Sequence, residues 1–60
     1  MNFRQLKAFN AVMQTGSITG AAKQMLVSQP SVTRLIHDLE LNLGFALFVR
    51  QGRGIIATVE

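Results

Sequence analysis

The chain has 60 residues, of which 48% are hydrophobic, and a formal net charge of +3 at pH 7. Sixty residues suffice for one small domain, and the hydrophobic share is too high for a disordered tail. The sequence has no cysteine and one histidine, which excludes disulfides, thiolate metal sites and a histidine zinc cluster. No apolar run approaches the roughly 20 residues of a membrane span, and no secretory signal is visible. We therefore expect no metal or cofactor in this chain, no membrane segment and a cytoplasmic location.

The basic residues are unevenly distributed along the chain. The first 37 residues contain no acid, and the six basic residues are Arg4, Lys7, Lys23, Arg34, Arg50 and Arg53. A basic surface suits the phosphates of a nucleic acid or an anionic membrane, although it also serves plain solubility. The choice between these interpretations therefore depends on the motifs.

A first helix is predicted over residues 3–15. Asn2 can cap its start, with Gln5 three residues later as the partner in a capping box. Gly16 suits the left-handed residue that ends a helix. Large apolar side chains recur at helical spacing and predict the buried side of this helix: Phe3, Leu6, Phe9, Val12 and Met13.

A second helix is predicted over residues 18–26, with Ser17 as its cap. Ala21 and Ala22 lie on its apolar side, where small side chains let another helix approach closely. Gly20 costs a helix about 1 kcal/mol relative to alanine. It is either a point of close approach or a local weakness, and the sequence does not decide between them.

A third helix is predicted over residues 29–43, after a turn at Val27 and Ser28. Ser28 can cap this helix, and Pro30 lies in its first turn, where a missing N–H costs nothing. Gly44 suits its end. One side of the helix is apolar and predicts the buried side: Val32, Leu35, Ile36, Leu39 and Leu43.

The remaining residues predict a β-hairpin. Two β-prone runs, at residues 45–50 and 55–58, flank the short Gln51-Gly-Arg-Gly54 segment. We therefore predict a mostly α fold, a winged helix-turn-helix with three helices and a C-terminal β-hairpin wing over residues 1–58. A further helix is expected to begin at residues 59–60, so that the chain is a fragment of a longer protein. The predicted core is Phe3, Leu6, Phe9, Ile18, Ala22, Met25, Val32, Ile36, Leu39, Leu47, Phe48 and Ile56.

The start of the third helix carries the strongest functional signal. Arginine pairs with guanine and glutamine with adenine in the major groove, while hydroxyls and free helix N–H groups bind bases or phosphates. A solvated, well-capped helix is the ordinary alternative, but the preceding helix and turn favour DNA. The candidate DNA-binding residues here are Ser28, Gln29, Pro30, Ser31, Thr33 and Arg34.

Three further candidates lie outside this helix. Arg53, between two glycines at the hairpin tip, can reach phosphates or the minor groove, and Arg50 and Thr19 can reach the DNA backbone. Edge-strand protection for the arginines and capping support for Thr19 are the alternatives. For Arg4, Lys7 and Lys23, a solvated helix surface is the ordinary interpretation.

Catalysis finds no support in the sequence. There is no cysteine nucleophile and no phosphate-binding loop, and one histidine with three scattered acids indicates no acid–base pair. We therefore do not expect an enzyme. A winged helix that docks another protein is the main rival, but the polar and basic exposed side of the third helix disfavours it.

These segments, in this order and spacing, resemble the N-terminal DNA-binding domain of the LysR-type bacterial transcription regulators. The resemblance covers essentially the whole chain: Phe3-Arg-Gln-Leu-Lys-Ala-Phe9, Gly16-Ser-Ile-Thr-Gly-Ala-Ala22, Val27-Ser-Gln-Pro30 with Thr33-Arg34, Leu39-Glu40, Leu43-Gly44 and Leu47-Phe48-Val-Arg50. Gly20 departs from the family pattern, in which a polar or larger residue is common.

The resemblance implies sequence-specific binding of double-stranded DNA, with the third helix in the major groove and residues 51–54 in the adjacent minor groove. In similar proteins, the positions matching Gln29, Pro30, Thr33 and Arg34 reach bases or nearby phosphates, and the position matching Arg53 enters the minor groove. It also implies a linker helix from residue 59 and a larger effector domain. A homodimer or tetramer is expected only where these two parts are present.

Overall fold

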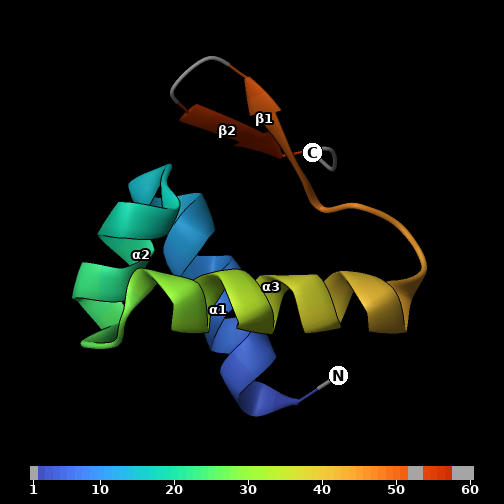
Figure 1. The fold of residues 1–60 in the computed structure, drawn as a ribbon, viewed down its shortest axis with the longest axis horizontal. Coiled ribbons are helices and arrows are strands. Elements are labelled where there is room, and N and C mark those ends of the chain that lie inside the picture. The colour runs from blue at the N-terminus through green and yellow to red at the C-terminus, as the bar shows by residue number, and fades with distance from the viewer. Residues whose placement is uncertain (1, 52–53, 58–60) are drawn as a thin grey trace.

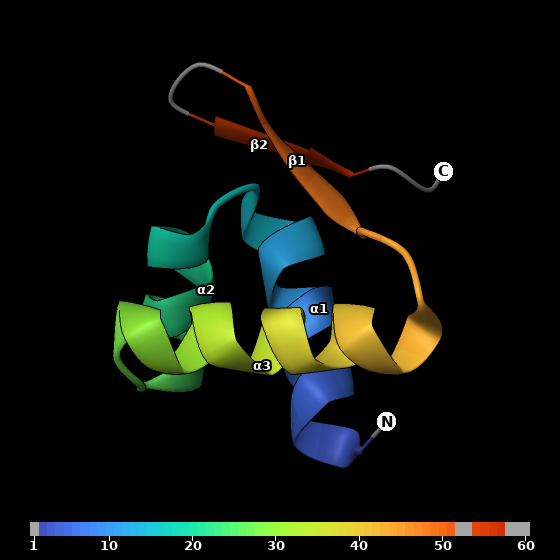
Figure 2. The ribbon, with the colours of Figure 1, turned by 45° about the vertical axis from the view of Figure 1, so that its right-hand side comes forward.

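The structure, a computed structural model, describes residues 2–51 and 54–57, and the side chains of residues 2–49. The helices are α1 (Phe3–Thr15), α2 (Ile18–Met25) and α3 (Gln29–Leu43), and the strands are β1 (Phe48–Gln51) and β2 (Gly54–Ala57). The predicted three helices and C-terminal hairpin are confirmed. Figure 1 shows α3 crossing α1, with the hairpin on the opposite side of the helices from the N-terminus, and Figure 2 shows the same arrangement from another direction. None of the helices in this described part is long and apolar enough to cross a membrane.

The predicted helix caps are confirmed. The Gln5 N–H donates to Asn2 Oδ1 at 2.8 Å, and the Asn2 N–H donates to Gln5 Oε1 at 3.2 Å, which completes the capping box of α1. Ser17 Oγ accepts the Gly20 N–H at 2.8 Å at the start of α2. Gly16 and Gly44 adopt left-handed φ values of 78° and 84° after α1 and α3. These local hydrogen bonds explain why the ends of α1 and α3 could be predicted.

The end of α2 differs from the prediction by one residue. The helix ends at Met25, and Leu26 follows it with a left-handed φ of 60° and a side chain that is 90% exposed. Its N–H donates to the Lys23 carbonyl and the Val27 N–H donates to the Ala22 carbonyl, a pattern that ends many helices after a glycine. Leucine is unfavourable in this conformation by roughly 1 kcal/mol, so no residue pattern indicates a helix end here.

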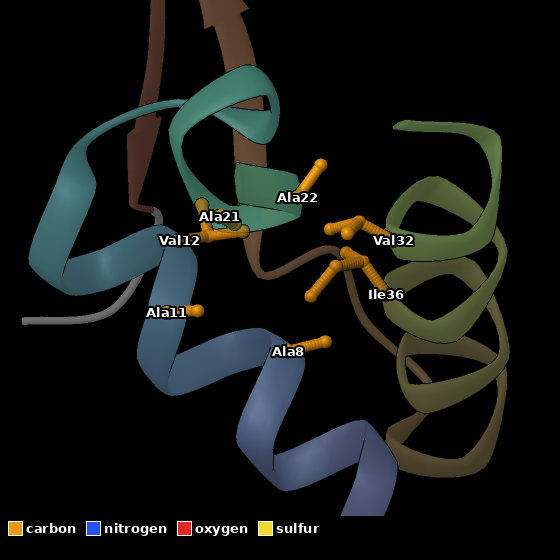
Figure 3. Close-up of a cluster of buried hydrophobic side chains, with 7 residues drawn as sticks. All are labelled: Ala8, Ala11, Val12, Ala21, Ala22, Val32 and Ile36. Carbon is orange, nitrogen blue, oxygen red and sulfur yellow. The ribbon is translucent and has the colours of Figure 1, made fainter. Parts of the chain in front are cut away.

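The core lies where the three helices meet, and small side chains dominate it. Figure 3 shows alanines of α1 and α2 facing Val32 and Ile36 of α3. Leu39 is also buried and Leu35 and Leu43 are half-buried, which confirms the predicted buried side of α3. Leu47, which was predicted to lie in the core, is buried as well. The buried cluster consists of Ala8, Ala11, Val12, Ala21, Ala22, Val32 and Ile36. Partly buried apolar side chains pack against it, among them Phe9, Ile18, Met25 and Phe48.

The predicted buried side of α1 is wrong in part. Phe3 is 74% exposed, and Leu6 and Met13 are each 46% exposed. Val12 is buried as predicted, and the other buried residues of α1 are Gln5, Ala8 and Ala11. The small residues there let α2 and α3 approach, whereas Phe3, Leu6 and Met13 face largely outward. The remaining predicted core residue, Ile56, has a side chain outside the described set.

The hairpin is antiparallel and pairs Phe48 with Ala57 and Gln51 with Gly54. The Phe48 ring lies 5.5 Å from the Phe9 ring, so that β1 is packed against α1. The first strand begins at Phe48 and not at residue 45 as predicted. The Leu47 N–H, just before β1, donates to the Glu40 carboxylate of α3, so that the chain is tied to the helix before the strand pairing begins.

Gly20 is a point of close approach, which settles the alternative that the sequence left open. A Cβ at this position would lie 2.7 Å from Thr15 Cβ and 2.9 Å from Thr15 Oγ1. The Thr15 hydroxyl donates to the Ala11 carbonyl at 2.8 Å, so this side chain cannot turn away without losing a hydrogen bond.

We therefore expect Gly20→Ala to lower the free energy of unfolding by about 1–2 kcal/mol, because the crowding outweighs the gain in helix propensity. Urea unfolding followed by circular dichroism measures the change. Thr19→Ala, the exposed neighbour in α2, is the control and should not destabilise comparably. A gain in stability for Gly20→Ala would show that helix propensity governs this position.

Candidate nucleic-acid interface

The exposed side of α3 gathers most of the candidate residues. Val32, Ile36 and Leu39 are buried, and the opposite side of the same helix therefore faces solvent. All of the candidates on α3 are exposed. One shallow hollow on this surface is lined by Gln29, Pro30, Thr33, Arg34 and His37. The packing of α3 thus brings the predicted base-contacting side chains together.

Ser28 and Ser31 are hydrogen-bonded to each other at the start of α3. Ser28 Oγ accepts the Ser31 N–H at 3.2 Å, and the two hydroxyl oxygens lie 2.8 Å apart in a further hydrogen bond. Both residues are exposed. Their hydroxyls stay accessible at the helix start, but the structure gives Ser28 a capping role in the first place.

Thr19 and Lys23 of α2 lie beside the start of α3. They line one hollow together with Leu26, Ser28 and Gln29. Thr19 is thus placed next to the candidate residues of α3, as the sequence analysis required. The sequence analysis interprets Lys23 as a solvated residue, but the turn between the two helices brings Lys23 to the same hollow.

Arg4 of α1 is a second cation that the fold brings to α3. It lines a hollow together with Ser31, Arg34, Leu35 and Asp38. No sequence pattern connects Arg4 with Arg34, since 29 intervening residues separate them. Only the packing of α1 against α3 places these two arginines at one hollow.

The two wing arginines are described less fully. Arg50 lies in β1, where its backbone pairs with Ile55. Arg53 lies outside the described residues, as do residues 58–60, where the end of the domain and the start of a linker helix were predicted. The roles of both arginines and the domain boundary therefore stay predictions.

Comparison with known proteins identifies the family. The model of the family described as bacterial regulatory helix-turn-helix protein, lysR family, matches residues 3–60. The chain belongs to the LysR family. The resemblance inferred from the sequence motifs is confirmed.

Named relatives of this LysR-family chain are regulatory proteins. It is 53% identical over 60 residues to the octopine catabolism/uptake operon regulatory protein OccR of Rhizobium meliloti. The matched segment is 100% of this chain and 20% of that protein. It is 49% identical over 57 residues to the regulatory protein NocR of Agrobacterium fabrum, covering 95% of this chain and 19% of that protein. The chain thus spans about a fifth of the length of these relatives. They are regulators and not enzymes, in agreement with the absence of catalytic motifs.

Solved structures agree with the fold. The CbnR DNA-binding domain, solved in a complex with DNA, superimposes with a TM-score of 0.92 at 49% identity, over 98% of this chain and 68% of that chain. The BenM DNA-binding domain, in a complex with catB site 1 DNA, gives a TM-score of 0.91 at 37% identity, over 98% and 66%. The winged helix-turn-helix architecture of this LysR-family chain is thereby shown.

The capping role of Ser28 can be separated from any contact that its hydroxyl makes with a ligand. We expect Ser28→Ala to lower the free energy of unfolding by about 1 kcal/mol without DNA, because the Ser31 N–H loses its acceptor. Ser31→Ala keeps that N–H and its acceptor, and should change stability by less than about 0.5 kcal/mol. Chemical denaturation of both variants measures this difference, and equal losses would contradict the capping assignment.

Proposed function

We propose that this LysR-family domain binds double-stranded DNA sequence-specifically and regulates transcription in the bacterial cytoplasm. In this proposal α3 enters the major groove, and the hairpin of β1 and β2, the wing, lies along the adjacent minor groove. The observation that carries the proposal is the exposed row of Gln29, Thr33 and Arg34 on the side of α3 opposite the core. The similar CbnR and BenM domains, which were solved with DNA, support it.

Base recognition is assigned to four residues of the hollow on α3. The Arg34 guanidinium can donate to both acceptors of a guanine, and the Gln29 amide can pair with an adenine. Pro30 and the methyl group of Thr33 offer apolar contact to a thymine methyl. Because these side chains line one hollow, they can read neighbouring base pairs without a rearrangement of the helix.

Phosphate binding is assigned to residues around this hollow. Thr19, Lys23 and Ser28 lie at one side of it and Arg4 at the other, next to Ser31 and Arg34. The positive end of the α3 helix dipole favours a phosphate in the same region. These contacts would fix the position of α3 on the duplex, while the bases give specificity.

The DNA contacts of the wing are assigned to Arg53 and Arg50. An arginine flanked by two glycines at a hairpin tip can enter a minor groove, where it meets a strong negative potential. Arg50 would contact the backbone nearby. A winged helix that docked a protein instead would bind through an apolar surface with little dependence on salt, which the polar side of α3 disfavours.

The relatives are about five times as long as this chain, so the operating unit is proposed to be larger. A linker helix and an effector domain would pair copies of this domain into a homodimer or tetramer. Two linked copies gain affinity because the second half-site is bound at high effective concentration. The single domain is therefore expected to bind one half-site weakly.

Arg34→Ala tests base recognition. Duplexes selected from a random library by the unchanged chain supply a cognate site, and a scrambled duplex supplies the comparison. We expect Arg34→Ala to lose about 1–3 kcal/mol of binding free energy on the cognate duplex and less on the scrambled one. Leu41→Ala, an exposed residue of the same helix outside this hollow, is the control and should lose little. Equal losses on both duplexes would remove Arg34 from base recognition.

Lys23→Ala tests the phosphate contacts. If the Lys23 ammonium neutralises one phosphate, the slope of log affinity against log salt should become shallower by about 0.9. Lys7→Ala removes the same charge from a residue whose Nζ lies 5.5 Å above the Phe3 ring, and should leave the slope unchanged. Fluorescence anisotropy at four salt concentrations gives both slopes. Identical slopes for the two variants would argue against a direct Lys23 contact.

A further inference from the structure

The side chain of Glu40, in α3, accepts two backbone N–H groups at the start of β1. Its Oε2 accepts the Leu47 N–H at 2.7 Å and the Phe48 N–H at 3.3 Å. Its backbone carbonyl accepts the Gly44 N–H at 2.8 Å. The start of β1 is therefore hydrogen-bonded to α3, the helix with the candidate DNA surface, through one side chain, that of Glu40.

These hydrogen bonds matter because the wing needs attachments to the helices. A two-stranded hairpin is marginally stable by itself, so its place depends on its attachments to the helices. Two attachments are apolar: Leu47 is buried, and the Phe48 ring packs on the Phe9 ring. Apolar burial is not directional, whereas a hydrogen bond to a carboxylate is both directional and charge-assisted. The Glu40 carboxylate is the attachment that can set the direction in which β1 leaves α3.

We propose that Glu40 is a positioning residue, which holds the wing at a fixed place beside α3 and thereby raises the affinity of the domain for DNA. The first half concerns the protein alone, and the second half rests on the proposed function. A wing that is ordered before DNA arrives does not need to be ordered during binding, and this preserves affinity. Charge alone predicts the opposite effect, since a carboxylate close to DNA repels phosphates and its removal should strengthen binding.

Two substitutions of Glu40 separate the effect of side-chain length from the effect of its negative charge. Glu40→Gln removes the charge but keeps a carbonyl oxygen at the same distance from the helix, where it can accept the Leu47 and Phe48 N–H groups. Glu40→Asp keeps the charge but withdraws the oxygens by one methylene. Amide hydrogen exchange of the 60-residue chain without DNA reports the Leu47 N–H, and anisotropy titration with the selected duplex reports affinity. Asp38→Ala, which removes an acid two residues earlier in α3, measures the effect of charge on DNA binding.

We expect Glu40→Asp to speed exchange of the Leu47 amide, leave the amide signals of α1 and α2 in place, and weaken DNA binding about ten-fold. Glu40→Gln should keep both the protection and the affinity, and Asp38→Ala should bind slightly more tightly. Unchanged protection in Glu40→Asp would overturn the positioning role of Glu40. Equal losses of protection in Glu40→Asp and Glu40→Gln would overturn the claim that the reach of the side chain, and not its charge, holds the wing. Lost protection with unchanged affinity would overturn the effect of Glu40 on DNA binding alone. If the unchanged chain bound no duplex, the proposed function would fail, and the exchange rates would still decide whether Glu40 holds the wing.

Discussion

The close approach of three helices over small side chains is the constraint on which the rest of this structure depends. Ala8 and Ala11 of α1 and Ala21 and Ala22 of α2 are almost completely buried. Larger residues at these positions would push the helices apart, because a packed interior has no room for added methylene groups. Gly20 extends the same constraint to the turn between α1 and α2, where a single Cβ would meet Thr15.

The candidate DNA surface follows from this packing. Once the apolar side of α3 is held against the alanines, the polar side of the same helix must face solvent. Gln29, Thr33 and Arg34 then lie in one hollow, with Lys23 and Arg4 brought in from the other two helices. The helix cap adds precision, since the hydroxyl of Ser28 accepts the Ser31 N–H and so fixes the first turn of α3.

The wing depends on side chains from two different helices. Phe9 of α1 supplies an apolar platform for Phe48, and Glu40 of α3 supplies an acceptor for the amides that lead into β1. Phe9 is far from the hairpin in sequence, whereas Glu40 lies eight residues before Phe48. A change in the packing of α1 against α3 would therefore move the wing as well as the recognition helix, and the two proposed DNA-contacting parts are mechanically linked through the core.

The sequence by itself determined what depends on neighbouring residues. The capping box at Asn2, the caps at Ser17 and Ser28, and the glycines after α1 and α3 act through hydrogen bonds and backbone angles within a few residues, so the bounds of α1 and α3 were predictable. The apolar periodicity of α3 identified its buried and exposed sides, and with them the candidate base-contacting residues. The motifs shared with the LysR family then indicated that these residues bind DNA.

Only the tertiary structure decided which side of α1 is buried, because periodicity gives weight to large apolar residues such as Phe3, whereas close helix packing selects alanine. It also decided where α2 ends, since a left-handed Leu26 carries no sequence signal, and it brought Arg4 to Arg34 and the Glu40 carboxylate to the start of β1. These contacts join residues from different elements. Their formation depends on how the helices pack, which no local pattern of residues encodes.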